Sequence, residues 1–178
     1  MSTSIKGHRS HNGTKASKSA DHRAVAPNAR RLVLVDIENL VGGMVANVEQ
    51  ARVVKAAVVR AIDLRADEQV IVASCHLGAV SAGLGWSKSR LLVQSGPDGA
   101  DLALLEVIAT ENLAARFTEV VLVSGDGIFT QAVAALTNAG ARVTLVALAG
   151  HCSRALALAA HETIRLPEFG WMTTPHAA

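Results

Sequence analysis

The chain has 178 residues, of which 50% are hydrophobic and 18% are charged, and its formal net charge is +2. This length suits one compact α/β domain, and no apolar run approaches the ~20 residues that a membrane span needs. Two cysteines, Cys75 and Cys152, are too few for a disulfide framework and lack metal-ligand spacing, which favours a reducing, cytoplasmic setting and argues against a zinc site built on cysteine. With no Tyr, three Phe and two Trp, an aromatic platform that stacks nucleic-acid bases is not expected.

Charge is distributed unevenly along the chain. Residues 1–31 hold seven Lys/Arg and one acid, a net +6, whereas the remainder holds ten Lys/Arg and fourteen acids, a net −4. Residues 1–30 are rich in Ser, Gly, Lys and His and contain no apolar run, so we predict a disordered basic tail. Such a tail is either a solvated leader or an arm for phosphate-bearing partners.

From residue 31 onward, short apolar runs alternate with longer segments of helical periodicity. In chain order we expect a strand at 32–35, a helix at 48–64, strands at 69–74 and 90–94, a helix at 101–115, a strand at 119–123, a helix at 129–138 that stops near Gly140, a strand at 142–146, a short helix at 153–160 and a sixth strand at 162–166. Continuous apolar runs between helices are typical of parallel strands that are covered on both faces. The sequence therefore predicts an α/β domain at 31–168, a mainly parallel sheet of five or six strands flanked by helices, and a C-terminal tail at 169–178.

Three aspartates lie at ends of the predicted elements. Asp36 follows the first strand, Asp126 follows the fourth strand through Ser124-Gly125, and Asp101 opens the helix after the third. In an open parallel sheet the functional crevice lies beyond the carboxyl ends of the strands, where the strand order reverses. If the first and fourth strands are neighbours there, their ends lie about 5 Å apart. We therefore expect the three carboxylates to share one crevice.

A cluster of carboxylates needs compensation. Two of them ~4 Å apart repel by about 4 kcal/mol at an effective dielectric constant of 20, unless a proton or a cation intervenes. Oxygen ligands favour Mg²⁺ or Mn²⁺ over zinc, and a metal-bound water could act as the nucleophile in phosphodiester hydrolysis. We predict Asp36, Asp101 and Asp126 as metal ligands and catalytic residues.

Each aspartate also has an ordinary structural explanation. Asp98 reads as a helix N-cap with Asp101 three positions later, an arrangement similar to a capping box. Asp126, between two glycines, fits turn chemistry. The convergence of three separate segments on one crevice favours the functional interpretation.

The segments that carry these acids resemble the NYN domain family, a branch of the PIN-like nucleases. The resemblance spans about residues 32–166 and rests on 35–40 (VDIENL), 99–104 (GADLAL), 121–129 (VLVSGDGIF), 140–146 and 153–166. It implies a three-layer, Rossmann-like PIN fold and metal-dependent RNA cleavage at the clustered acids. By motif position, Asn39 would orient the first acid or a substrate phosphate, and the Ser124 hydroxyl would face a phosphate at the following helix start.

The sequence departs from the family pattern at Ile128, because the family usually has another Asp two positions after the acid of the Ser-Gly-Asp turn. The missing carboxylate leaves three options open: a one-metal site, weaker metal affinity, or a domain that binds RNA without cutting it. Glu38 is a candidate to compensate if its side chain shares a face with that of Asp36, but a loop there would leave its direction open. Family differences at His161 and Thr163 are expected to affect packing more than chemistry.

Other functions of similar folds fit less well. A haloacid-dehalogenase-like phosphatase needs a second Asp where this chain has Glu38, a phosphorelay receiver needs an Asp after the third strand, and a dinucleotide-binding domain needs a Gly-rich turn after the first. We therefore expect a Mg²⁺- or Mn²⁺-dependent endoribonuclease whose partner is RNA and not a membrane. The alternative is a catalytically silent NYN domain that binds RNA or a protein partner. The sequence leaves room for a homo-oligomer.

Overall fold

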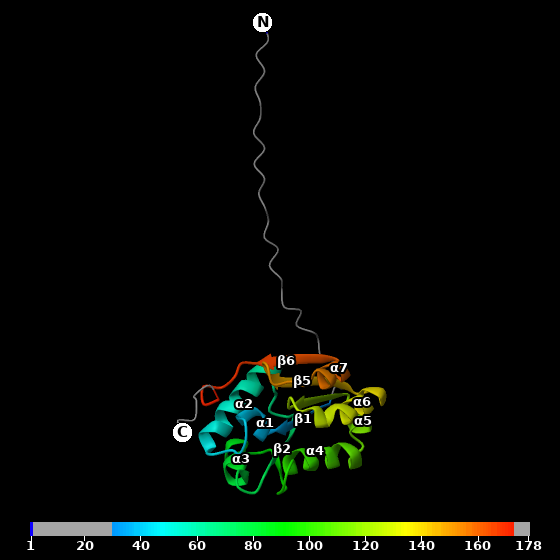
Figure 1. Ribbon diagram of the computed structural model, residues 1–178. Helices are drawn as coiled ribbons and strands as arrows, with labels where there is room; N and C mark the ends of the chain where they lie inside the picture. The colour runs from blue at the N-terminus through cyan, green and yellow to red at the C-terminus, as the bar shows by residue number, and fades with distance from the viewer. Residues whose placement is uncertain (2–29, 173–178) are drawn as a thin grey trace.

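Six parallel strands form one central sheet in the order β3-β2-β1-β4-β5-β6 (Figure 1). The structure is a computed structural model, and it describes Met1 and residues 30–172. The strands are β1 (Arg31–Asp36), β2 (Gln69–Ser74), β3 (Arg90–Val93), β4 (Glu119–Val123), β5 (Arg142–Leu148) and β6 (Glu162–Leu166). The strand order reverses between β1 and β4, so the predicted switch point is confirmed.

Helices cover both faces of the sheet and make three layers. The helices are α1 (Ile37–Val41), α2 (Val48–Ile62), α3 (Ala79–Gly85), α4 (Gly99–Thr110), α5 (Leu113–Arg116), the 3₁₀ helix η1 (Gly127–Phe129), α6 (Thr130–Asn138) and α7 (Arg154–Ala159). One core lies between the sheet and α1, α2 and α3, and the other lies between the sheet and α4 to α7. Within the described residues, every helix falls short of the length or apolar character that crossing a bilayer requires.

Most predicted elements are confirmed, and the exceptions have local causes. β2, β4 and β6 begin and end at the predicted residues. The helix expected at 101–115 is divided into α4 and α5, because Asn112 adopts a φ of 48° in the left-handed region, which interrupts a right-handed helix. The sequence pattern does not predict α1 or α3, since helices of 5 and 7 residues are too short to show a period of 3.6.

The chain continues to pack on the domain after β6. The rings of Phe169 and Trp171 stack with their centroids 4.8 Å apart, Phe169 is buried in the core beside α2, and Trp171 Nε1 donates to the Val41 carbonyl oxygen at 3.2 Å. The predicted tail boundary at residue 168 therefore cuts through a packed segment, and residues 169–172 belong with the domain. The predicted basic tail at 1–30 lies almost wholly outside the described residues, as do residues 173–178.

Candidate active site

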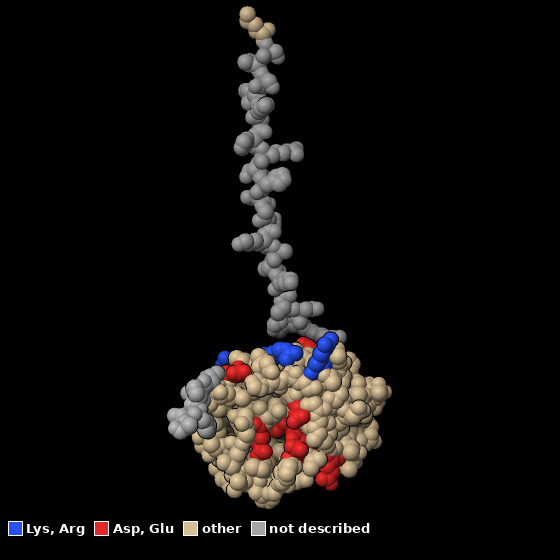
Figure 2. All heavy atoms as spheres, in the orientation of Figure 1, with Lys and Arg blue, Asp and Glu red and all other residues tan. Residues whose placement is uncertain are grey.

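The carboxyl ends of β1 and β4 lie side by side. Val35 is in register with Val123, so Asp36, the last residue of β1, lies beside Ser124, the residue that follows β4. Figure 2 shows acidic side chains gathered in the middle of the face that displays this end of the sheet, with Lys and Arg side chains along its upper edge. The acids therefore meet at the edge of the sheet where the sequence predicts a crevice.

Asp36 is held in place by two hydrogen bonds. Its side chain is 3% exposed, its Oδ1 accepts from the backbone N–H of Asn39 at 3.2 Å, and its Oδ2 accepts from the Ser124 hydroxyl at 2.9 Å. Burial raises the pKa of Asp36, and the nearby charge of Glu38 acts in the same direction, whereas the hydrogen bonds oppose it. A buried carboxyl with a raised pKa, fixed at a strand end, is typical of a functional group.

Asp101 faces Asp36 from the first turn of α4. Burial is the largest cause that raises the pKa of Asp101, to about 8, and the charge of Asp36, a hydrogen bond between the two carboxyls and the charges of Asp126 and Asp98 add to it. Asp101 Oδ1 is buried and has no hydrogen-bond partner among the residues that the structure describes. The Asp36–Asp101 pair therefore keeps one proton near neutral pH, and it presents an oxygen that no described residue satisfies.

Asp126 lies at the solvent side of the same crevice. Its side chain is exposed, its Oδ1 accepts from the Ile128 backbone N–H at 2.9 Å, and its own N–H donates to the Ser124 hydroxyl oxygen at 3.2 Å. The turn chemistry expected for this residue is thus present. The charge of Asp126 contributes to the raised pKa of Asp101, so the two side chains lie in one crevice.

Asn39 and Ser124 both tie the two strand ends together. The Asn39 side-chain oxygen accepts from the Gly125 N–H at 2.8 Å, which fastens α1 to the loop after β4. The Ser124 hydroxyl is fully buried, where it donates to Asp36 and accepts from Asp126. It therefore differs from the phosphate-facing hydroxyl expected from the sequence, because protein atoms already use it.

Glu38 is a fourth acid of the crevice. It lies in the first turn of α1, and its Oε1 accepts from the Ser74 hydroxyl at 3.2 Å and from the Cys75 N–H at 2.8 Å, both at the carboxyl end of β2. The sequence could not decide its direction between an extended strand and a loop. The short helix α1 settles it, since the first helical turn directs Glu38 toward β2 and near Asp36.

The capping box expected around Asp98 does not form. Asp98 is the N-cap residue of α4, but its φ is 54° and its side chain makes no capping hydrogen bond. Asp101, the other member of the expected box, faces Asp36 instead. The capping role expected for Asp101 is therefore wrong, and the position of its side chain is determined by the contact with Asp36.

The crevice offers few ligands for a divalent ion. Among the described residues, no group of three or more His, Cys, Asp or Glu side chains is arranged to hold a metal ion. Mg²⁺, however, usually takes one or two carboxylates and keeps several waters. The Asp36–Asp101 pair, with its unsatisfied buried oxygen, fits that smaller set, and coordination by all three aspartates stays a prediction.

Replacing Ser124 with Ala is expected to lower the free energy of unfolding by about 1–3 kcal/mol, because Asp36 Oδ2 would lose its donor while it stays buried. Urea unfolding followed by circular dichroism measures the change. Ser87→Ala, at an exposed position after α3, is the matched control and should change stability by less than about 0.5 kcal/mol. Equal values for the two variants would contradict the positioning role of Ser124.

Comparisons with known proteins bear on the family and the fold of the chain. The family model described as the NYN domain matches residues 86–167, which include Asp101, Ser124 and Asp126. The fold is similar to that of a protein of unknown function from Vibrio parahaemolyticus, with a TM-score of 0.54 and 15% sequence identity over 80% of this chain and 96% of that one. No curated protein matches the chain. Over residues 86–167, a little under half of its length, the chain is similar to the NYN domain family.

Proposed function

We propose that the chain is a Mg²⁺- or Mn²⁺-dependent endoribonuclease that hydrolyses RNA phosphodiester bonds at Asp36, Asp101 and Asp126. One observation carries the proposal: two carboxyl groups lie against one another at the switch point of the sheet, and a buried oxygen of Asp101 has no partner. Such a pair is costly without a proton or a cation. The match of residues 86–167 to the NYN domain family, a branch of the PIN-like nucleases, supports the reaction class.

In this proposal Asp36 and Asp101 would hold the ion and Asp126 would complete the site. A bound divalent ion supplies charge that polarises a phosphate and lowers the pKa of a water molecule. Ser124 and the Asn39 N–H keep the Asp36 carboxyl in one orientation. Asp101 would bind such an ion as the carboxylate, so its proton would have to leave for the side chain to act as a ligand.

Asp126 has a separate role as a proton acceptor. The Ile128 N–H fixes its Oδ1, whereas no described residue hydrogen-bonds to its Oδ2. That oxygen is available to accept a proton from a water that attacks the phosphate. The exposure of Asp126 at the mouth of the crevice suits a group that exchanges protons with solvent.

The alternative function is a catalytically silent NYN domain that binds RNA or a protein partner. Ile128, at the position where the family usually has an acid, is 37% exposed. It lines an apolar groove of about 630 Å³ between α4–α5 and η1–α6, to which the described residues contribute no charged side chain. An apolar groove beside the acids suits the binding of an RNA or protein partner better than it suits metal chemistry, and it favours this second function.

The test incubates labelled single-stranded and structured RNAs with the full chain in Mg²⁺, in Mn²⁺ and in chelator. Asp126→Asn keeps the side-chain oxygen that accepts from Ile128 but removes the charge, so we expect at least a tenfold loss of metal-dependent cleavage with an unchanged fold. Asp67→Asn, at an exposed position before β2, is the control and should cleave like the wild type. Equal cleavage by Asp126→Asn and wild type would overturn the assignment, and RNA binding without cleavage would favour the silent domain.

A further inference from the structure

Several arginines lie at the edge of the sheet away from the acids. Arg31, Arg90 and Arg142 are the first residues of β1, β3 and β5, and each forms an ion pair with a glutamate. Because all six strands are parallel, these residues lie at the amino ends of the strands. These three arginines are paired with glutamates and lie far from the crevice. They are therefore poorly placed to contact an RNA strand at Asp36 and Asp101.

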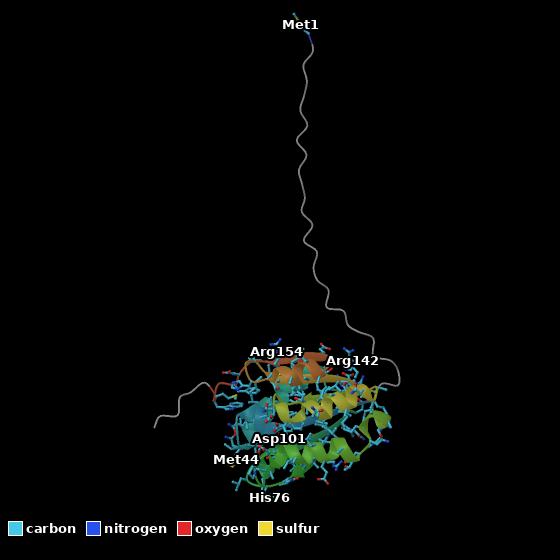
Figure 3. The ribbon with its side chains drawn as sticks, turned by 45° about the vertical axis from the view of Figure 1, so that its right-hand side comes forward. Met1, Met44, His76, Asp101, Arg142 and Arg154 are labelled. Atoms are coloured by element: carbon cyan, nitrogen blue, oxygen red, sulfur yellow. The ribbon has the colours of Figure 1, made fainter. Side chains whose placement is uncertain are left out.

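Two other arginines lie near the carboxyl ends of the strands. Arg154 is the first residue of α7, which follows β5, and Arg165 is the residue before the last of β6. Both are exposed, and neither forms an ion pair or hydrogen bond within the described part of the chain. Figure 3 places Arg154 above Asp101, with Arg142 displaced toward the other end of the domain.

Arg165 shares a face of the sheet with α7. Ile164 and Leu166 pack in the core beside α2, and successive side chains of a strand point to opposite faces. Arg165 therefore points to the face that α7 covers, where Leu156 of α7 is buried. The two guanidinium groups belong to one basic rim, defined by Arg154 and Arg165, at the β6–α7 side of the acidic crevice.

The backbone before Arg154 is fixed against the Ser-Gly-Asp turn. Ser153 N–H donates to the Gly125 carbonyl oxygen at 2.9 Å. The contact is so close that a Cβ on Gly125 would lie 1.8 Å from the His151 carbonyl oxygen, and one on Gly127 would lie 3.1 Å from Ser153 Oγ. Arg154 is thus anchored next to the loop that carries Asp126.

We infer that the basic rim binds RNA phosphates on one side of the scissile bond. The inference rests on the proposed function and adds the direction in which the strand leaves the site. An acidic crevice repels a polyanion, so affinity must come from cations beside it, and arginine pairs with phosphate in bidentate geometry. Two free guanidinium groups on a rigid part of the same edge meet that need.

The test measures how salt weakens binding of a single-stranded RNA. All proteins carry Asp126→Asn, which slows cleavage, and are assayed in Mn²⁺ over times at which a gel shows the RNA to be uncut. Each phosphate contact on a single strand contributes about 0.7 to the slope of log K against log salt. Arg154→Gln with Arg165→Gln is therefore expected to flatten the slope by about 1.4, so that raising salt from 50 to 200 mM costs about sevenfold less affinity than in the parent.

Two further variants separate charge from structure. Arg154→Lys with Arg165→Lys keeps the charges and should restore most of the slope. Arg52→Gln with Arg60→Gln removes two exposed arginines of α2, on the opposite face of the sheet, and should leave the slope unchanged. If the glutamine pair at the rim leaves the salt slope unchanged, as the α2 pair should, the inference is overturned but the proposed function is not. If the parent protein binds no RNA, both the inference and the proposed function are overturned.

Discussion

Replacing Asp101 with Asn is expected to reduce metal-dependent RNA cleavage by about 10²- to 10³-fold, the usual size for one lost electrostatic group at a reacting centre. The variant should fold and keep its stability. Protonated Asp101 already shares a hydrogen bond with Asp36, and an Asn amide can donate to Asp36 in the same way. What the variant loses is the carboxylate itself, because an amide cannot offset the charge of a divalent ion.

Asp98 offers a closely matched control. It lies three residues before Asp101, at the N-cap of the same helix, and its side chain is exposed and makes no capping hydrogen bond. Asp98→Asn should keep cleavage within about twofold of the wild type, because the charge of Asp98 is the smallest of the named influences on Asp101 and its side chain is exposed. Initial rates in Mn²⁺ and unfolding midpoints in chelator measure both effects. Similar cleavage by Asp101→Asn and Asp98→Asn would remove Asp101 from the proposed site.

The architecture was predictable because it follows from local patterns and one rule of topology. Apolar runs such as 119–123 match the observed strand, and a parallel sheet must bring the ends of β1 and β4 together once these strands are neighbours. The position of Asp36 beside Ser124 and Asp126 follows from those two facts alone. That part of the site can therefore be predicted without knowing how the side chains are oriented.

The hydrogen bonds within the site could not be predicted in the same way. The bond from Ser124 to Asp36 joins residues 88 positions apart, and the bond from Trp171 to Val41 joins residues 130 positions apart. From its position in the motif, the Ser124 hydroxyl was expected to face a phosphate. In the structure it is buried at the end of β4 and donates to Asp36. Local capping rules likewise predict a pairing of Asp98 with Asp101. In the structure Asp101 contacts Asp36 instead, a tertiary contact that local rules do not include.

Stability in chelator is expected to fall as the pH rises from about 4 toward 8. The pKa of Asp101 is raised from 3.8 to about 8 in the folded chain, so between these values the folded state binds more protons than the unfolded state. The free energy of unfolding then decreases with pH, and the contribution of the bound proton is fully present below 3.8 and lost through about 8. The raised pKa of Asp36 acts with the same sign.

The slope has an upper limit and a control. One retained proton is worth at most about 1.4 kcal/mol per pH unit, and the partial exposure of Asp101 to solvent reduces this value. Urea unfolding at pH 5, 6, 7 and 8 gives the slope for the wild type and for Asp101→Asn. The variant should show a clearly flatter profile and should be the more stable protein at pH 8, and parallel profiles would contradict the shared proton.

The same proton links stability to metal. Because the ion and the proton compete for the Asp101 carboxyl, Mn²⁺ should raise the melting temperature of the wild type more at pH 8 than at pH 6. Asp101→Asn should show little increase at either pH. A rise that is equal in both proteins would mean that the ion binds elsewhere, whereas a rise confined to the wild type ties the ion to the carboxyl pair that charge repulsion otherwise destabilises.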